Sequence, residues 1–316
     1  MHRLRFLCSR LIAALLVMTA FVSVGRASDA AMRPLRVLFF SKSANFEHSV
    51  VKRVDGQPSW AEQILGELGK KRGYEFTFTK DGSQITPEFL TKFDVLFFYT
   101  CGFFTNDVPN VDGQPPMSEA GLRAVYDAVA AGKGFVGCHS ASDCLHTGEQ
   151  PQVNFQTEPG RWVNHGAASH PWVRFLGGEF IRHGAQQATE IRVVSPEFPG
   201  LKALPAATRF AEEWYSLKDF APDLHVVHLM ETAGMEGLEY RRPAFPCTWA
   251  RRHGKGRVFY TSLGHREDVW ASEFFQTTIA AGLNWAGGRV EADVTPNLER
   301  VAPGARQLPP TPPDAK

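Results

Sequence analysis

Apolar residues in the first half of the chain fall into short, nearly continuous runs that alternate with amphipathic segments. Such runs are typical of strands buried on both faces of a parallel sheet. We predict strands at residues 35–41, 74–79, 94–100 and 134–139. Helical spacing, capping serines and stop glycines predict helices at residues 49–72, 85–93 and 117–133. This alternation predicts an α/β fold with a doubly wound, mostly parallel sheet flanked by helices.

The second half of the chain begins with a change of pattern. Residues 142–172 are polar and rich in turn formers, which predicts a long irregular loop. Strand-like segments then follow at residues 179–184, 189–194, 224–230 and 245–252. The turn HGKG predicts a hairpin between the last of these and residues 257–265. A closing helix is predicted at 271–288, and the proline-rich tail 288–316 is expected to be extended and mobile.

Residues 1–27 have the pattern of a secretory signal peptide, with a basic start, an apolar run and small residues at its end. We expect cleavage after Ala27 and export to the periplasm or the extracellular space. The apolar run is short for a membrane span, so we expect none in the mature protein. Without the four arginines of this segment, 30 basic and 33 acidic residues remain. The resulting net charge of −3 is not that of a protein that binds nucleic acid.

Four cysteines remain in the mature chain, and their spacing predicts neither a disulfide framework nor a zinc site. One bridge, for example through Cys144, is compatible with an exported protein. Cys138 and His139 end the predicted strand 134–139. Successive strand side chains point to opposite faces, so only one of this pair can face a cleft. We interpret Cys138 as a small core residue and His139 as the candidate for chemistry.

Several imidazoles are predicted to gather at the carboxyl edge of the sheet, where open α/β sheets bind ligands. His48 follows the first strand, and His265 ends the strand-like segment 257–265 as His139 ends its own strand. His183 follows two glycines that permit close approach of the backbone. Each of the three has an alternative interpretation as a solvent-exposed or loop-capping histidine. We assign His146, His165 and His170 to a lid formed by the irregular loop.

The motifs NFEHSV, GKGFVGCHSASD, FLGGEFIRH, EEWYSL and TWARRHGKGRVFYTSLGH occur in this order over residues 45–265. On these motifs the chain resembles the ThuA-like (trehalose utilisation) family, a variant of the class I glutamine amidotransferase-like, flavodoxin-like three-layer fold. The resemblance implies one domain over residues 28–287. It also implies that His139 stands where amidotransferases of this fold carry their nucleophilic cysteine. One departure is AFPCTW (244–249), where the family often has His-Pro before the tryptophan.

The resemblance further implies carbohydrate metabolism, with trehalose-type disaccharides or their keto derivatives as a small-molecule substrate class. The family pattern favours Glu213 over its neighbour Glu212 as the inward-facing acid. We therefore expect His139 and Glu213 to act as an acid–base pair in a hydrolase, lyase or isomerase reaction. Residues expected to contact the substrate are His48, His183, Tyr215, Trp249, His265 and Arg266. Trp249 has an almost equal claim as a core residue, and Arg266 as a residue of the rim.

A divalent metal such as zinc is an open alternative, because imidazoles with a carboxylate are a common ligand set. The possible ligands are His48, His139, His183 and His265. No HxH or HExxH spacing is present, so the sequence does not decide between metal-assisted and purely organic chemistry. Two other functions stay open: a non-catalytic sugar-binding protein that uses the same cleft, and an amidase that depends on Cys138.

Overall fold

The computed structural model describes residues 33–105, 110–148 and 158–313. The elements below all belong to the compact unit that begins at Pro34. Two expectations fall outside the described residues, namely the signal peptide over 1–27 and the part of the irregular loop at 149–157. No helix within the described ranges has the length and apolar character needed to cross a membrane.

A nine-stranded sheet forms the centre of this unit, with the strand order β2-β1-β3-β4-β11-β10-β9-β6-β7. The first five strands in this order are parallel, and the last four are antiparallel to their neighbours. The parallel strands are β1 (Leu35–Ser43), β2 (Tyr74–Thr79), β3 (Val95–Cys101), β4 (Gly134–Cys138) and β11 (Gly256–Thr261). The antiparallel extension consists of β10 (Phe245–His253), β9 (His225–Met230), β6 (Gln187–Val193) and β7 (Ala207–Glu212).

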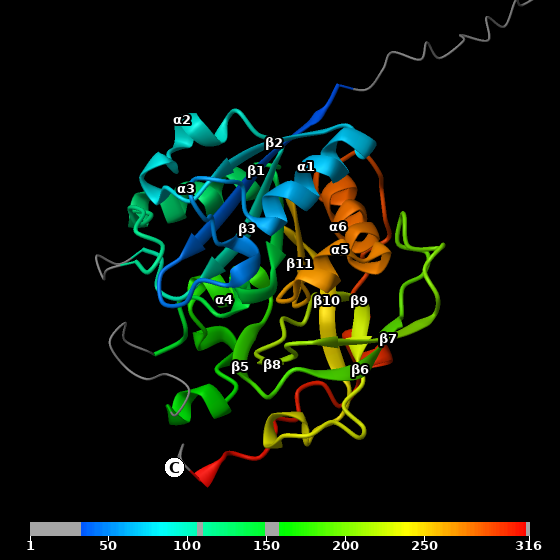
Figure 1. The fold of residues 1–316 in the computed structure, drawn as a ribbon. Coiled ribbons are helices and arrows are strands. Elements are labelled where there is room, and N and C mark those ends of the chain that lie inside the picture. Colours follow the sequence, from blue (N-terminus) through cyan, green and yellow to red (C-terminus); the bar gives the residue numbers. More distant parts are fainter. Residues whose placement is uncertain (1–32, 106–109, 149–157, 314–316) are drawn as a thin grey trace, which may run out of the picture. The chain divides into compact units, whose positions relative to one another are not determined.

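The inner parallel strands are apolar because helices cover both of their faces (Figure 1). Every residue of β3 and β4 is buried, as expected for strands between two helical layers. One layer contains α1 (Trp60–Arg72), α5 (Glu267–Ala271) and α6 (Glu273–Ala286). The other contains α2 (Pro87–Leu90), α3 (Glu119–Ala130) and α4 (Pro171–Leu176). The predicted three-layer α/β fold is confirmed.

Local sequence signals account for most helix boundaries. Ser118 caps α3 by accepting a hydrogen bond from the Gly121 amide, as its position in the sequence predicts. The predicted helix 49–72 is divided in two: a single 3₁₀ turn, η1 (Ser49–Val51), precedes α1. The reason is a second start signal, since Ser59 and Glu62 form a capping box at the beginning of α1.

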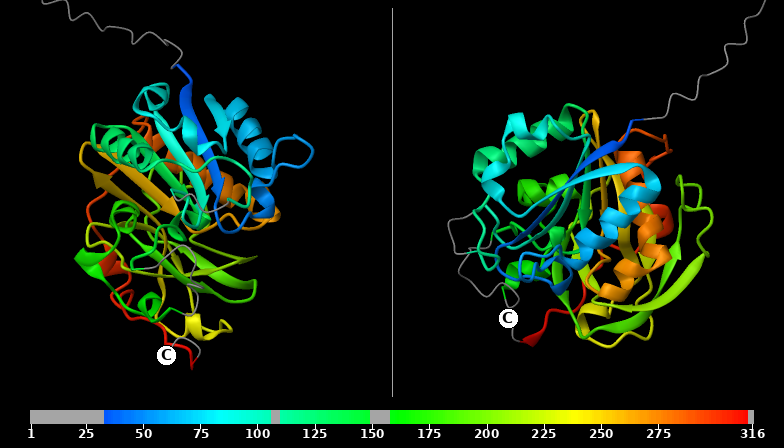
Figure 2. Two further views of the ribbon diagram at one scale, coloured as in Figure 1. Left: turned by 90° about the vertical axis from the view of Figure 1, so that its left-hand side faces the viewer. Right: turned by 45° about the horizontal axis from the view of Figure 1, so that its top comes forward.

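Two elements around Glu213 are not evident from the sequence pattern. The strand β7 ends just before this residue, and β8 (Tyr215–Lys218) begins just after it. β8 pairs with β5 (Glu179–His183) in a separate two-stranded sheet. Figure 2 shows this green part of the chain, which includes β5 and β6, below the parallel strands in its left-hand view. β7 was missed because it is an edge strand with several exposed positions, so its apolar pattern is weak.

The C-terminal segment differs from the extended, mobile tail that its composition predicts. It contains the short helix α7 (Leu298–Val301), and Leu298 and Ala305 are buried against the domain. The amide of Asn297 donates to the carbonyl oxygen of Leu224 at 3.0 Å. The tail prediction was therefore wrong for residues 297–305, because a few apolar side chains and main-chain hydrogen bonds hold that segment in place.

Candidate functional site

Four side chains from distant parts of the chain converge at the carboxyl edge of the parallel strands. They are His48, His139, Glu213 and His265, and one ligand atom of each lies within 4.8 Å of those of the others. Glu213 Oε2 lies 3.1 Å from His265 Nδ1 and 3.5 Å from His139 Nε2. The ring centroids of His139 and His265 are 5.3 Å apart. The predicted meeting of strand-end imidazoles beside a carboxylate is present in the structure.

The parallel topology explains why these histidines meet. β1, β4 and β11 run in the same direction, so the segments that follow them leave the sheet at one edge. His48 lies after β1, at the start of η1. His139 lies directly after β4, and His265 lies in the connection from β11 to α5. Glu213 approaches from the antiparallel side, between β7 and β8.

His139 has an unusual backbone conformation, with φ of 45°. A positive φ is costly for a residue with a β-carbon and occurs often at functional sites. It begins a 3₁₀ turn, η3 (His139–Ser142), immediately after the strand, and its side chain is fully buried. The backbone of the adjacent segment is also constrained. Gly264 has φ of 117°, and a β-carbon there would lie 2.9 Å from Cys138 Sγ.

The hydrogen bonds of His139 define which nitrogen faces the cluster. Its Nδ1 lies 2.8 Å from the carbonyl oxygen of Ser262 and therefore carries the proton that is donated. Burial lowers the pKa of His139 despite the opposing effect of Glu213, so the ring is neutral at pH 7. Nε2 is then an unprotonated acceptor, and it has no hydrogen-bond partner among the described residues. Two acceptors, Nε2 and a Glu213 oxygen, face each other across 3.5 Å.

The other members of the cluster have charges of different kinds. Burial, together with repulsion by His139 and His265, lowers the pKa of His48 well below its ordinary value. Its Nδ1 is buried without a hydrogen-bond partner in the described part of the chain. Burial alone would raise the pKa of Glu213, but the surrounding imidazoles, with His265 Nδ1 at 3.1 Å, outweigh this and hold it well below the usual range. The pKa of His265 is raised, because Glu213 outweighs desolvation there. The cluster thus offers an ionised carboxylate, neutral imidazoles at His48 and His139, and at His265 an imidazole whose protonated form the carboxylate favours.

A cavity of about 440 Å³ opens beside the cluster. His48 and Glu213 belong both to the cluster and to the cavity wall. Two predicted contact residues, His183 and Tyr215, also line it. The side chain of His183 is 35% exposed, and its Nδ1 lies 3.0 Å from the carbonyl oxygen of Gly184. The volume lies within the range of small-molecule pockets.

The family model described as ThuA, trehalose utilisation, matches residues 36–286. The chain belongs to the ThuA family. No match was found among curated proteins.

Solved structures of similar fold include two proteins described as ThuA-like. The protein from Bacteroides uniformis has a TM-score of 0.57 and 18% identity, covering 83% of this chain and 95% of the other. The protein from Parabacteroides merdae has a TM-score of 0.55 and 17% identity, covering 90% and 99%. At these identities the likeness shows the fold of this ThuA-family protein and not its activity.

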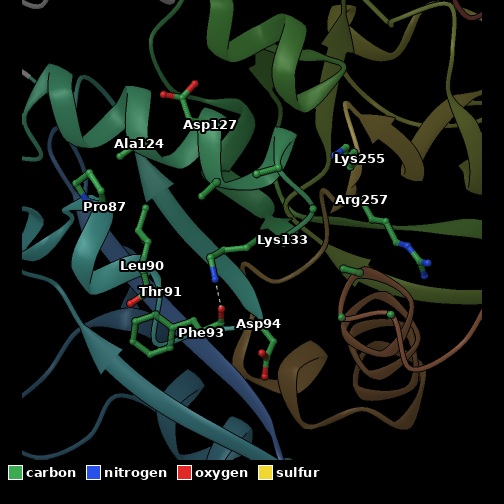
Figure 3. Close-up of a pocket in the computed structure, with 16 residues that line it drawn as sticks. Pro87, Leu90, Thr91, Phe93, Asp94, Ala124, Asp127, Lys133, Lys255 and Arg257 are labelled. Carbon is green, nitrogen blue, oxygen red and sulfur yellow. Dashed lines mark hydrogen bonds between the residues drawn. The ribbon is translucent and has the colours of Figure 1, made fainter.

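A second cavity, of about 720 Å³, lies at the opposite edge of the ThuA-family sheet (Figure 3). Its wall includes Asp94, Lys133 and Arg257, at or just before the starts of β3, β4 and β11. The ammonium group of Lys133 donates to the carbonyl oxygen of Phe93, as drawn in Figure 3. Among the described residues no histidine lines this cavity, and its charged groups lie at or beside strand starts except Asp127, which belongs to α3. It is therefore separate from the cluster of imidazoles.

Cys138 is unsuited to nucleophilic chemistry. It is fully buried, its thiol donates to the carbonyl oxygen of Leu263, and burial raises its pKa well above the ordinary value. A reactive cysteine needs an exposed, stabilised thiolate, which this environment opposes. This environment argues against the amidase alternative, and the core position predicted for Cys138 is confirmed. Cys101, Cys138, Cys144 and Cys247 are all free, so the bridge considered for Cys144 is absent.

Two predicted contact residues lie away from the cavity. Trp249 is fully buried, its indole N–H donates to the carbonyl oxygen of Leu176, and its ring packs 4.4 Å from that of Tyr260. It lies in the middle of β10 and belongs to the hydrophobic core. Arg266 forms an ion pair with Asp268 on the surface and does not line the cavity. The full burial of Trp249 contradicts its assignment as a substrate contact, whereas for Arg266 that assignment stays a prediction.

The three histidines assigned to a lid instead make contacts within the domain. His146 is buried, with Nε2 at 2.8 Å from Asp143 and Nδ1 at 3.0 Å from Glu179. His170 caps α4 by accepting from the Trp172 amide. His165 Nδ1 lies 3.3 Å from the buried ammonium group of Lys218. Their polar sequence context suggested exposure, but local partners anchor His170, and partners distant in the sequence hold His146 and His165.

Sequence analysis missed several residues of the cavity wall. They are Asn45, Phe46, Cys101, Asp143 and Phe180. Asn45 and Phe46 belong to the motif that contains His48, and Asp143 ends the motif that contains His139. The strand-end rule that selected the histidines applies equally to these neighbours, so their positions were the available signal.

Proposed function

We propose that this ThuA-family protein is an enzyme that acts on a carbohydrate in the cavity beside Glu213, with a divalent metal ion held by His48, His139, Glu213 and His265. The substrate class that we propose is a trehalose-type disaccharide or its oxidised keto derivative. The family match and the pocket-sized cavity support a sugar substrate. From the pattern of residues 1–27 we also propose that the protein acts after export.

The observation that carries the metal is the unpaired Nε2 of His139 facing the ionised Glu213. A lone pair and a carboxylate oxygen repel each other at 3.5 Å unless a cation lies between them. In a tetrahedral zinc site with bonds of about 2.0–2.1 Å, neighbouring donor atoms are about 3.3–3.5 Å apart. The distances of 3.1 and 3.5 Å between Glu213 and the two imidazoles are close to this value.

The surroundings of His139 also fit a metal ligand better than a proton-transfer group. The bond from Nδ1 to Ser262 is the kind of second contact that orients a ligating imidazole. The ring has no exposed surface, so a substrate in the cavity would not reach it. We therefore revise the expected acid–base pair of His139 and Glu213 into two ligands.

The bound ion would supply Lewis-acid polarisation of a sugar carbonyl or hydroxyl group. Among the imidazoles at the cavity, His183 is suited to proton transfer, because its side chain is partly exposed there. Its Nδ1 proton is donated to Gly184, which leaves Nε2 as the proton acceptor. Tyr215 stays protonated because burial raises its pKa well above the ordinary value, so its hydroxyl is available as a donor to a sugar oxygen.

The test combines elemental analysis with turnover. We expect about one divalent metal per purified chain, and turnover of trehalose or keto-trehalose that is lost on chelation and restored by adding the metal. The Glu213→Gln variant should lose both metal and turnover, whereas His253→Ala, far from the cluster on β10, should keep both. Full turnover by a metal-free chain would contradict the metal, and tight sugar binding without any product would favour the non-catalytic binding protein.

A further inference from the structure

A second carboxylate reaches the proposed sugar cavity from the same turn that carries His139. Asp143 directly follows η3, four residues after His139, and lines the cavity with a side chain that is 11% exposed. The motif HSASD thus delivers an imidazole to the cluster and a carboxylate to the cavity wall in one turn. No step of the proposed function uses this carboxylate.

Asp143 is held by a row of buried charges. Its Oδ1 accepts a hydrogen bond from His146 Nε2 at 2.8 Å and lies 3.5 Å from the guanidinium group of Arg161. His146 is in turn bonded through Nδ1 to Glu179 at 3.0 Å. Arg161 is fixed by the carbonyl oxygens of Phe180 and Ile181. A buried imidazole and a buried guanidinium thus fix one oxygen of the carboxylate and balance its charge.

The other carboxylate oxygen, Oδ2, has a much weaker hydrogen-bond partner. Within the described residues, the partner recorded for Oδ2 is the Cys101 thiol, with its sulfur 3.7 Å away. A thiol is a weak donor, so it satisfies little of the hydrogen-bonding capacity of an ionised oxygen. Cys101 lines the same cavity. A buried carboxylate with one firmly held oxygen and one nearly unsatisfied oxygen is prepared to accept a donor from a ligand.

The neighbouring groups indicate what kind of donor fits. Asp143 and Glu213 both raise the pKa of Tyr215, so the phenol lies within the field of two carboxylates. Aromatic rings of Phe46 and Phe180 complete the wall, and Phe46 is 57% exposed. The His146 and Arg161 charges offset Asp143, so the wall does not require a cationic ligand. A sugar ring fits such a wall. Its hydroxyl groups can donate hydrogen bonds to the carboxylates, and its apolar C–H faces can pack against the aromatic rings.

We propose that Asp143 binds hydroxyl groups of the sugar through its weakly bonded Oδ2, as a substrate-binding residue distinct from the proposed metal cluster. This inference rests on the proposed function, in that it takes a sugar to be the occupant of the cavity. The hydroxyl that Asp143 binds sets the position of the sugar ring relative to Glu213 and His183.

The experiment measures binding by calorimetry with trehalose, keto-trehalose and a set of monodeoxy trehaloses. Asp143→Asn should weaken binding of the intact sugars by about 10- to 100-fold, the effect of a hydrogen bond to a charged group. Metal content should stay close to that of the parent, whereas the thermal midpoint should fall, because the neutral amide no longer balances the buried charges of His146 and Arg161. The control Asp127→Asn removes the same charge from the opposite edge of the sheet and should bind as the parent does.

The deoxy sugars identify the contact independently of the variant's folding. One deoxy position should cost the parent at least about tenfold in affinity and cost Asp143→Asn little, because the two changes remove the same bond. If Asp143→Asn does not fold, the parent alone still tests the inference, because insensitivity to every deoxygenation overturns it. Uniform insensitivity to deoxygenation, or unchanged sugar affinity in Asp143→Asn, overturns this inference alone. A parent that binds none of the sugars overturns the proposed function and this inference with it.

Discussion

The imidazole of His139 donates its Nδ1 proton to the carbonyl oxygen of Ser262 at 2.8 Å, so the segment after β11 sets the tautomer of a histidine that directly follows the neighbouring strand β4. The same contact turns Nε2 toward Glu213. Neither segment by itself predicts this contact, because the two residues are 123 positions apart in the sequence.

This relationship predicts that His139 is essential for binding of the proposed metal ion. His139→Ala should lower zinc affinity by at least about 100-fold, because a primary ligand is lost where even outer contacts matter 10- to 100-fold. His253→Ala is the matched control. Competition with a chromophoric chelator measures the affinity, and equal values for the two variants would contradict the ligand assignment.

Adjacent glutamates should behave differently. Glu212 is fully buried and accepts hydrogen bonds from the amides of Glu213 and Gly264 at 2.8 and 3.1 Å. Glu212→Gln presents an amide donor to one of these donors, so we expect a loss of about 1–3 kcal/mol in the free energy of unfolding with metal retained. Glu213→Gln should lose metal at a smaller cost in stability. Urea unfolding and elemental analysis of both variants check this, and identical behaviour would argue against separate roles.

Cys138 is expected to be inert in the folded protein. Because the thiol is fully buried and its pKa is raised, iodoacetamide should label it in urea but not under native conditions. Cys138→Ala should retain turnover. Peptide mapping by mass spectrometry locates the label, and native labelling of Cys138 with loss of turnover would restore the amidase hypothesis.

The two aromatic residues Trp249 and Phe46 should separate stability from binding. Trp249→Phe should lower the free energy of unfolding by about 1–3 kcal/mol, since a buried hydrogen bond and packed volume are lost, and leave sugar affinity unchanged. Phe46→Ala should change stability by about 0.5 kcal/mol or less, because the ring is 57% exposed, but should weaken sugar binding. The opposite pattern would support Trp249 as the aromatic residue that contacts the sugar.

Stability should fall in mild acid because of His228. Burial lowers the pKa of this histidine from 6.5 to about 3, and both ring nitrogens lack partners among the described residues. The unfolded chain therefore takes up a proton before the folded one, and stability present above pH 6.5 is lost as the pH falls toward 3. His228→Leu removes this penalty. Its advantage over the parent should grow by about 2 kcal/mol between pH 7 and pH 5, measured by urea unfolding. A constant difference would contradict the buried neutral state.

The sequence by itself determined the parallel half of the fold. Continuous apolar runs such as 94–100 predict strands because burial on both faces leaves no polar alternation, and caps such as Ser118 are read within one helical turn. Strand-end positions also selected His48, His139 and His265, since parallel strands end at a common edge. The lid histidines, Trp249 and the C-terminal segment were misjudged, because their burial depends on partners far away in the chain.

Only the tertiary structure decided the chemistry of the site. Glu213 comes from the antiparallel side, Asp143 is anchored by His146 and Arg161, and the tautomer of His139 depends on Ser262. Periodicity reports which face of an element is buried, but it does not contain the distances between elements. Charge, protonation and ligand geometry follow from those distances, so they appear only when the segments are packed together.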